Sequence, residues 1–159
     1  MQLFYASIGG GITGIETLIL LIDKINNNLR NNKNFKKNKI VLAIIDRDPS
    51  NIPGGVAYGF KKSLFGYFNN PLRLSPKKFN NWVLKNNNKL KLINYLKIYG
   101  GHTGKEWIKK NRKILLSAKS KKLKELYVPR VMMNYWMQEK LISKLKSISN
   151  EYRLYKKNL

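Results

Sequence analysis

The stretch SIGGGITGIE, Ser7–Glu16, decides the fold that this sequence predicts. It places Gly9, Gly11 and Gly14 in the G-x-G-x-x-G spacing of dinucleotide-binding loops. The run LFYASI (Leu3–Ile8) directly before them is apolar and rich in strand-forming residues, so it predicts a buried strand. After them, apolar residues recur at helical spacing, which predicts a helix that begins at the glycine turn.

A second strand follows this helix after a long connection. The tract Asn26–Lys39 consists mainly of Asn and Lys, so we expect the helix to end there in a solvated loop. The apolar run Ile40–Ile45 predicts the second strand, and Asp46 follows it directly. The right-handed crossover rule makes the two strands parallel and adjacent. The sequence therefore predicts an α/β protein with a Rossmann-like βαβ unit over residues 1–60.

Each glycine of the motif would have its own steric role in a dinucleotide-binding fold. Gly9 would allow the tight turn out of the strand, Gly11 would let a pyrophosphate approach the backbone, and Gly14 would allow close helix–strand packing. The phosphates would bind free N–H groups at the helix N-terminus, and Asp46 would accept hydrogen bonds from a ribose, with Asp48 as the second choice. The alternatives are a purely structural glycine turn and an ordinary acid in a turn.

Residues 61–159 predict a mainly helical second part of the same single domain. Ser75 is expected to cap one helix, with Pro76 in the first helical position, and a following helix is expected to end at Gly100. A late helix is expected to begin near Pro129. Residues 49–60 predict a loop, and residues 152–159 have the composition of a further strand. In the first helix, Glu16 is expected in the first turn, where the helix dipole favours an acid.

The composition is strongly basic and lacks cysteine. Lys and Arg number 32 against 8 Asp and Glu, which gives a formal net charge of +24. Such a charge attracts nucleic acid, but the accompanying Asn and Ile are typical of an AT-rich coding sequence, so weak polyanion binding stays an alternative. The absence of Cys excludes disulfides and thiolate metal sites. The apolar run Thr17–Ile22 is far below the roughly 20 residues that span a bilayer, and no secretory signal is visible; we expect a cytoplasmic protein without a membrane partner.

Three further segments resemble the FAD/NAD(P)-binding proteins of the urate-hydroxylase-like group. They are IPGGVAYG (Ile52–Gly59), FNNPLRLSPKKFNNWV (Phe68–Val83) and YVPRVMMNYWMQEKL (Tyr127–Leu141). The residues in family positions are Asn69, Pro71, Phe79, Trp82, Pro129, Arg130 and Tyr135. The chain departs from the family pattern at Leu74, Met133, Asn134 and Trp136. With the glycine loop, the resemblance extends from the N-terminus to about Leu141.

This resemblance implies the FAD-binding N-terminal part of a flavin-dependent oxidoreductase or monooxygenase that also uses NAD(P)H. It implies that the three glycines hold the FAD pyrophosphate and that Asp46 holds the adenosine ribose. It makes Arg130 a phosphate or cofactor contact, with a salt bridge or helix cap as the alternative. Asn69 and Pro71 would shape the loop near the flavin or serve the fold alone, and no catalytic residue is assigned. A complete family member would be longer, so the resemblance also implies an incomplete domain. The alternatives are a split gene, a truncated relic that is inactive alone, and a fragment whose missing half a second chain supplies.

Two other interpretations stay open, a basic nucleic-acid-binding module on a degenerate Rossmann scaffold and a non-catalytic nucleotide-binding fragment.

The stretch GGHTGK, Gly100–Lys105, is not expected to be a P-loop, because its glycine spacing is wrong and Glu106 stands in the Ser/Thr position. His102 is the only histidine and has no second ligand in local register, so no metal site is expected. The aromatic residues Phe79, Trp82, Tyr135 and Trp136 lie at helical spacing and are expected in the core, with cofactor stacking as the alternative.

Overall fold

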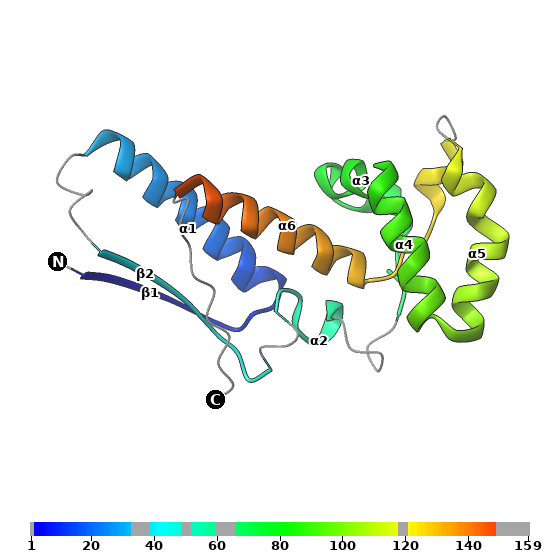
Figure 1. The fold of residues 1–159 in the computed structure, drawn as a ribbon, viewed down its shortest axis with the longest axis horizontal. Coiled ribbons are helices and arrows are strands. Elements are labelled where there is room, and N and C mark those ends of the chain that lie inside the picture. Colours follow the sequence, from blue (N-terminus) through cyan, green and yellow to red (C-terminus); the bar gives the residue numbers. More distant parts are fainter. Residues whose placement is uncertain (1, 33–38, 49–51, 60–65, 118–120, 149–159) are drawn as a thin grey trace. The chain divides into compact units, whose positions relative to one another are not determined.

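The computed structural model describes residues 2–32, 39–48, 52–59, 66–117 and 121–148 (Figure 1). They belong to two compact units. The first comprises the described residues up to Gly59 and those from Met137 on, and the second comprises those between Phe60 and Trp136. The expected division was at residue 60, with everything after it in one helical region. The segment from Met137 on instead belongs to the first unit. The expected strand at 152–159 lies outside the described residues.

The first unit contains two parallel strands joined through a helix. Strand β1 (Gln2–Ile8) pairs with β2 (Lys39–Ile45) in a continuous register from Gln2–Lys39 to Ile8–Ile45. Helix α1 (Ile12–Asn31) begins directly after the glycines. The predicted α/β class and the parallel, adjacent strands are confirmed at this level. A short helix α2 (Gly55–Tyr58) occupies part of the stretch that was predicted as a loop.

Helix α1 covers the sheet with its apolar face. The residues at helical spacing on this face are buried, and they are Ile15, Leu18, Ile19, Ile22 and Ile25. Helix α6 (Val131–Ile148) adds buried Met137 and Leu141 to this unit. Figure 1 shows α1 and α6 on the same side of the two strands. Among the described residues of the strands, Phe4, Ile8 and Ile45 are exposed.

Polar pairs fix α6 beside α1 within the first unit. The Lys140 ammonium donates to both carboxylate oxygens of Glu16 at 2.7 Å, and the Lys144 ammonium donates to Asp23 at 2.5 Å. The expectation for Glu16 is therefore wrong, because α1 begins at Ile12 and its first turn has no acidic residue. Glu16 stabilises the pairing of the two helices instead of the helix end.

The second unit is helical. Its elements are the 3-10 helix η4 (Leu72–Leu74), α3 (Lys77–Val83), α4 (Asn86–Tyr99), α5 (Gly101–Leu116), the 3-10 helix η5 (Lys121–Glu125) and the first residues of α6. The expected end of α4 at Gly100 is confirmed. The expected cap is wrong, because Ser75 ends η4 and Pro76 takes the N-cap position of α3 without a side-chain hydrogen bond.

An aromatic cluster forms the centre of the second unit. The ring of Phe79, which is fully buried, lies 5.7 Å from Phe68, 6.2 Å from Trp82 and 5.5 Å from Trp136, centroid to centroid. Such tilted and stacked pairs add to the free energy gained from burial alone. Phe79 and Trp82 are buried, as their helical spacing predicts, whereas Tyr135 and Trp136 are only partly buried.

Candidate nucleotide-binding site

Gly9 makes the turn at the end of β1. Its φ angle of +92° lies in a region that residues with a Cβ rarely adopt. Its N–H donates to the carbonyl oxygen of Ile45 at 2.7 Å, which ties the turn to the end of β2. The glycine loop and the carboxyl end of the second strand therefore form one structure.

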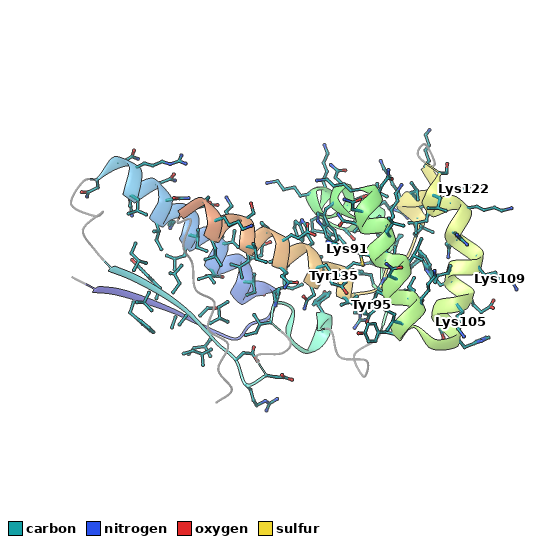
Figure 2. All side chains as sticks on the ribbon, in the orientation of Figure 1. Lys91, Tyr95, Lys105, Lys109, Lys122 and Tyr135 are labelled. Carbon is teal, nitrogen blue, oxygen red and sulfur yellow. The ribbon has the colours of Figure 1, made fainter. Side chains whose placement is uncertain are left out.

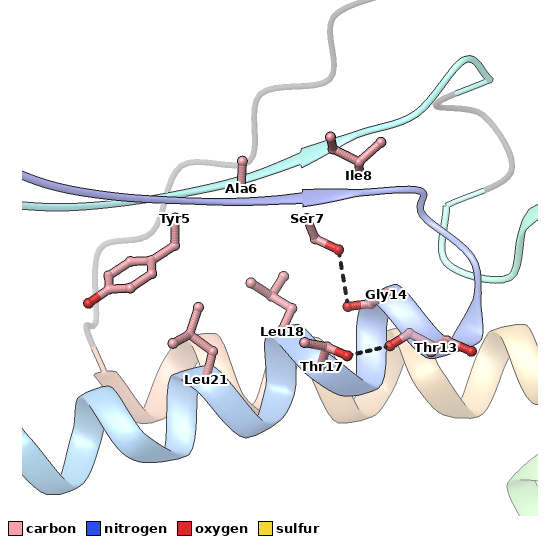
Figure 3. A pocket seen from close by; sticks show the side chains of 9 residues that line it. All are labelled: Tyr5, Ala6, Ser7, Ile8, Thr13, Gly14, Thr17, Leu18 and Leu21. Carbon is pink, nitrogen blue, oxygen red and sulfur yellow. Dashed lines mark hydrogen bonds between the residues drawn. The ribbon is translucent and has the colours of Figure 1, made fainter.

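Gly14 lies where α1 comes closest to this turn. A Cβ at this position would overlap the carbonyl oxygen of Gly9 and would lie 3.0 Å from the Ser7 hydroxyl oxygen. The Ser7 hydroxyl donates to the Gly14 carbonyl at 3.4 Å, and Figure 3 shows this bond between β1 and the first turn of α1. The absence of a side chain at Gly14 is what lets the helix begin so close to the strand.

Gly11 is the N-cap residue of α1 and, unlike the crowded Gly14, has open space where a side chain would be. A Cβ on Gly11 would meet no atom within 4 Å, and its φ of −67° is one that any residue adopts. The Gly11 carbonyl accepts the Ile15 N–H at 3.0 Å, but Gly11 has no side chain that could accept the earlier N–H groups of the first turn. These N–H groups and the positive end of the helix dipole favour an anion at this point.

Gly10 is the residue of the loop that sequence reasoning missed. A Cβ there would overlap the side chain of Ile52 and would lie 3.1 Å from an Asp46 carboxylate oxygen. The Gly10 N–H donates to Asp46 Oδ2 at 2.5 Å, and its carbonyl accepts the Gly54 N–H at 3.0 Å. The only signal in the sequence was the unbroken run of three glycines.

Asp46 lies at the end of β2, where the sequence places it, and its carboxylate faces the glycine loop. Oδ2 accepts the Gly10 N–H, and Oδ1 accepts the Asp48 N–H at 2.9 Å. These bonds hold the loop and the turn after β2 together. A carboxylate can accept more than two hydrogen bonds, so this arrangement leaves acceptor positions for a ribose hydroxyl.

A pocket of about 370 Å³ lies between β1 and α1 (Figure 3). Its lining consists of Tyr5, Ala6, Ser7, Ile8, Thr13, Gly14, Thr17, Leu18 and Leu21. Gly14 is the one residue of the glycine motif in this lining. Gly11, over which the motif predicts a phosphate, does not line this pocket, and a Cβ on it would meet open space.

The other predicted cofactor residues lie in the second unit and form a cluster of their own. Arg130 Nε donates to the Tyr67 carbonyl at 2.8 Å, and Arg130 Nη2 donates to Asn69 Oδ1 at 2.9 Å. The Arg130 backbone N–H donates to the Gly66 carbonyl at 2.9 Å, and Pro71 is buried just before η4. Arg130 and Asn69 therefore bind each other and fix the chain around residues 66–69. Their joint role was not evident from the sequence, because 61 positions separate them.

The glycines and Asp46 belong to the first unit, whereas Asn69, Pro71 and Arg130 belong to the second. The structure thus gives two local groupings of the predicted site residues.

His102 is exposed in the first turn of α5. In the described ranges, no three His, Asp or Glu side chains come together in a way that could hold a metal ion.

Comparison with protein-family models, curated proteins and solved structures gave no match to this chain. None of the helices in the described ranges is both long and apolar enough to cross a membrane.

Proposed function

We propose that the first unit binds the pyrophosphate of a dinucleotide, FAD, as the N-terminal portion of a flavin-dependent, NAD(P)H-linked oxidoreductase or monooxygenase. One observation carries this proposal. The glycine turn lies between a parallel strand and the N-terminus of α1, and Asp46 at the end of the neighbouring strand binds the same turn. This is the arrangement that a Rossmann-like βαβ unit offers to a dinucleotide.

The four glycines of the loop have two kinds of role: three shape the turn, and one gives a ligand access to the backbone. Gly9 and Gly14 give the turn its conformation, and Gly10 lets Asp46 and Ile52 close against it. A Cβ would meet open space at both Gly9 and Gly11, but Gly11 is the N-cap residue of α1, so a phosphate can approach the backbone N–H groups of the helix there. The residues present therefore fit a pyrophosphate, and the acceptor positions left on Asp46 suit a ribose hydroxyl.

The choice of FAD over NAD follows from the resemblance of the segments around Asn69–Pro71 and Pro129–Arg130 to the flavoprotein group. Bound flavin would supply the hydride and electron transfer, and the protein would bind it and exclude water. In this proposal the named residues bind or position the cofactor.

The test is a titration of the purified chain with FAD, NAD⁺ and NADP⁺, followed by thermal unfolding and by visible absorbance. Ligand at about a hundred times its Kd stabilises the folded state by roughly 2.7 kcal/mol, which is a clear shift of the midpoint. Gly11→Ala is the decisive variant, because its Cβ meets no protein atom and yet lies where the pyrophosphate would approach. We expect this variant to keep its ligand-free stability and to bind FAD at least tenfold more weakly.

Gly66→Ala is the matched control, since a Cβ at Gly66 also meets no atom within 4 Å and the residue lies in the other unit. It should bind FAD like the unmodified chain. Equal binding of FAD and NAD⁺ would remove the flavin assignment and leave a dinucleotide site. No stabilisation by any dinucleotide, or equal FAD binding by Gly11→Ala, would refute the proposal.

A further inference from the structure

The second unit carries much positive charge with little to neutralise it. Between residues 60 and 136 the acidic residues are Glu106 and Glu125, against many lysines and several arginines. Glu125 pairs with Arg73 at 3.0 Å in an exposed position. The described lysines of α5 have no carboxylate within ion-pair distance. The surface around α5 is therefore strongly attractive to anions.

A groove with aromatic residues in its lining lies along one face of α5. It has a volume of about 650 Å³, and its lining includes Trp107, Tyr127, Lys110 and Lys122. Both acidic residues of this unit, Glu106 and Glu125, also line it, and Glu125 is paired with Arg73. Helix α5 has only Gly104 and Leu115 buried, so most of its length faces solvent or this groove. Figure 2 shows Lys105 and Lys109 along α5 and Lys122 on η5, in the same part of the second unit.

One aromatic side chain of the groove, Trp107, is held in place by a hydrogen bond. The Trp107 indole N–H donates to the backbone carbonyl of Tyr127 at 2.9 Å, which fixes the orientation of the ring. The side chain of Tyr127 is 47% exposed. A fixed indole next to an accessible phenol offers flat surfaces on which a planar ring can stack at a low cost in side-chain entropy.

We propose that this groove binds single-stranded nucleic acid. Bases enter the hollow and stack on Trp107 and Tyr127, while the phosphates contact Lys110 and Lys122 of its lining. Lys105 and Lys109, elsewhere on α5, add to the attractive field. The combination of stacking surfaces with a basic track is what sequence-tolerant single-strand binding requires. The lysines extend along the helix beyond the groove, which suits a strand with successive phosphates better than a mononucleotide.

An anionic membrane is the other polyanion that lysines attract, and the geometry disfavours it. Membrane-surface binding needs apolar side chains that project into the lipid beside the basic ones. Here Trp107 and Ile114 line a hollow instead. A lipid headgroup would reach the lysines but would leave the aromatic surfaces unused.

Fluorescence anisotropy with a labelled single-stranded oligonucleotide of about ten nucleotides tests the proposal directly. In the double variant Lys110→Gln with Lys122→Gln, we expect at least a tenfold loss of affinity. The slope of log affinity against log salt should fall by roughly 1.4, because two phosphate contacts to a single strand are lost. Tyr127→Ser should weaken binding roughly fivefold or more through the lost stacking, and it keeps the backbone carbonyl that holds Trp107.

The matched control is Lys77→Gln with Lys78→Gln on α3, which removes the same charge from exposed lysines that do not line the groove. It should change the affinity less than threefold or so, by the general loss of field alone. Equal weakening by both double variants, or unchanged binding in Tyr127→Ser, would overturn the proposal. Tighter binding to vesicles of anionic phospholipid than to the oligonucleotide would do so as well. The FAD titration concerns the other unit, so the two tests fail independently.

Discussion

Substituting Gly14 by alanine should destabilise the first unit, although alanine is the better helix former. An ideal Cβ at Gly14 would overlap the carbonyl oxygen of Gly9 and press on the Ser7 hydroxyl. The Gly9 carbonyl cannot retreat easily, because the Gly9 N–H is bound to Ile45 at 2.7 Å and its φ is already +92°. The helix must therefore shift away from the strand.

The magnitude follows from two opposing terms. Alanine in a helix is worth about 1 kcal/mol over glycine. Overpacking a close contact costs about 1–3 kcal/mol, and a backbone carbonyl gives way less readily than the end of a side chain. We expect a net loss of about 1–2 kcal/mol for Gly14→Ala. Gly11→Ala should change the stability by less than about 1 kcal/mol, because its Cβ meets nothing and only the N-cap preference changes.

Amide hydrogen exchange measures this difference where it arises. Because the chain has two units, a single global unfolding curve need not follow α1, whereas exchange of the α1 amides reports the opening of this helix. Exchange in α1 should be faster in Gly14→Ala and nearly unchanged in Gly11→Ala. If the α1 amides of Gly14→Ala exchange as slowly as those of the unmodified chain or more slowly, the gain in helix propensity outweighs the overlap. The close approach of α1 to the glycine turn is then refuted.

Two further predictions concern the second unit. Arg130→Lys should lower the free energy of unfolding by about 1–2 kcal/mol, because lysine cannot reproduce the two side-chain hydrogen bonds of the guanidinium. The control Arg73→Lys, in an exposed ion pair, should lower it by less than about 1 kcal/mol. Chemical denaturation measures both values. Burial, with smaller effects of two neighbouring tyrosines, raises the pKa of Tyr95 to about 12. The folded state therefore keeps a proton that the unfolded state loses near pH 10, so stability should fall as the pH rises from about 10 to about 12. Tyr95→Phe should flatten this slope, and an unchanged slope would contradict the assignment.

The parallel pairing of β1 and β2 could be predicted from the sequence because each step depends on local patterns. Short apolar runs give strands, the i, i+3, i+4 repeat from Ile15 to Ile25 gives a helix, and a helical connection between adjacent strands makes them parallel. These signals need no knowledge of distant contacts. The same locality explains why the burial of Phe79 and Trp82 was also predictable.

The details that were missed depend on residues far apart in the chain. Glu16 binds Lys140 across 124 positions, and no local rule connects them. Asn69 and Arg130 were each expected near a cofactor, yet each is the other's hydrogen-bond partner. Gly10 received no role because its crowding comes from Ile52 and Asp46, which only the fold brings near. In each case the partner, not the residue type, determines what the side chain does.

The distribution of charge separates two explanations of the basic composition. A coding bias toward lysine acts on the whole chain and accounts for the number of lysines, but it does not select their surroundings. In the first unit, Lys140 and Lys144 are neutralised by Glu16 and Asp23. In the groove of the second unit, Lys110 has no such partner in the described part of the chain and shares the lining with Trp107 and Tyr127. If composition alone set the charge, lysines on α3 and lysines that line the groove would contribute equally to polyanion binding. Unequal effects of the two double variants would show that location, and not number, gives the second unit its affinity for a strand.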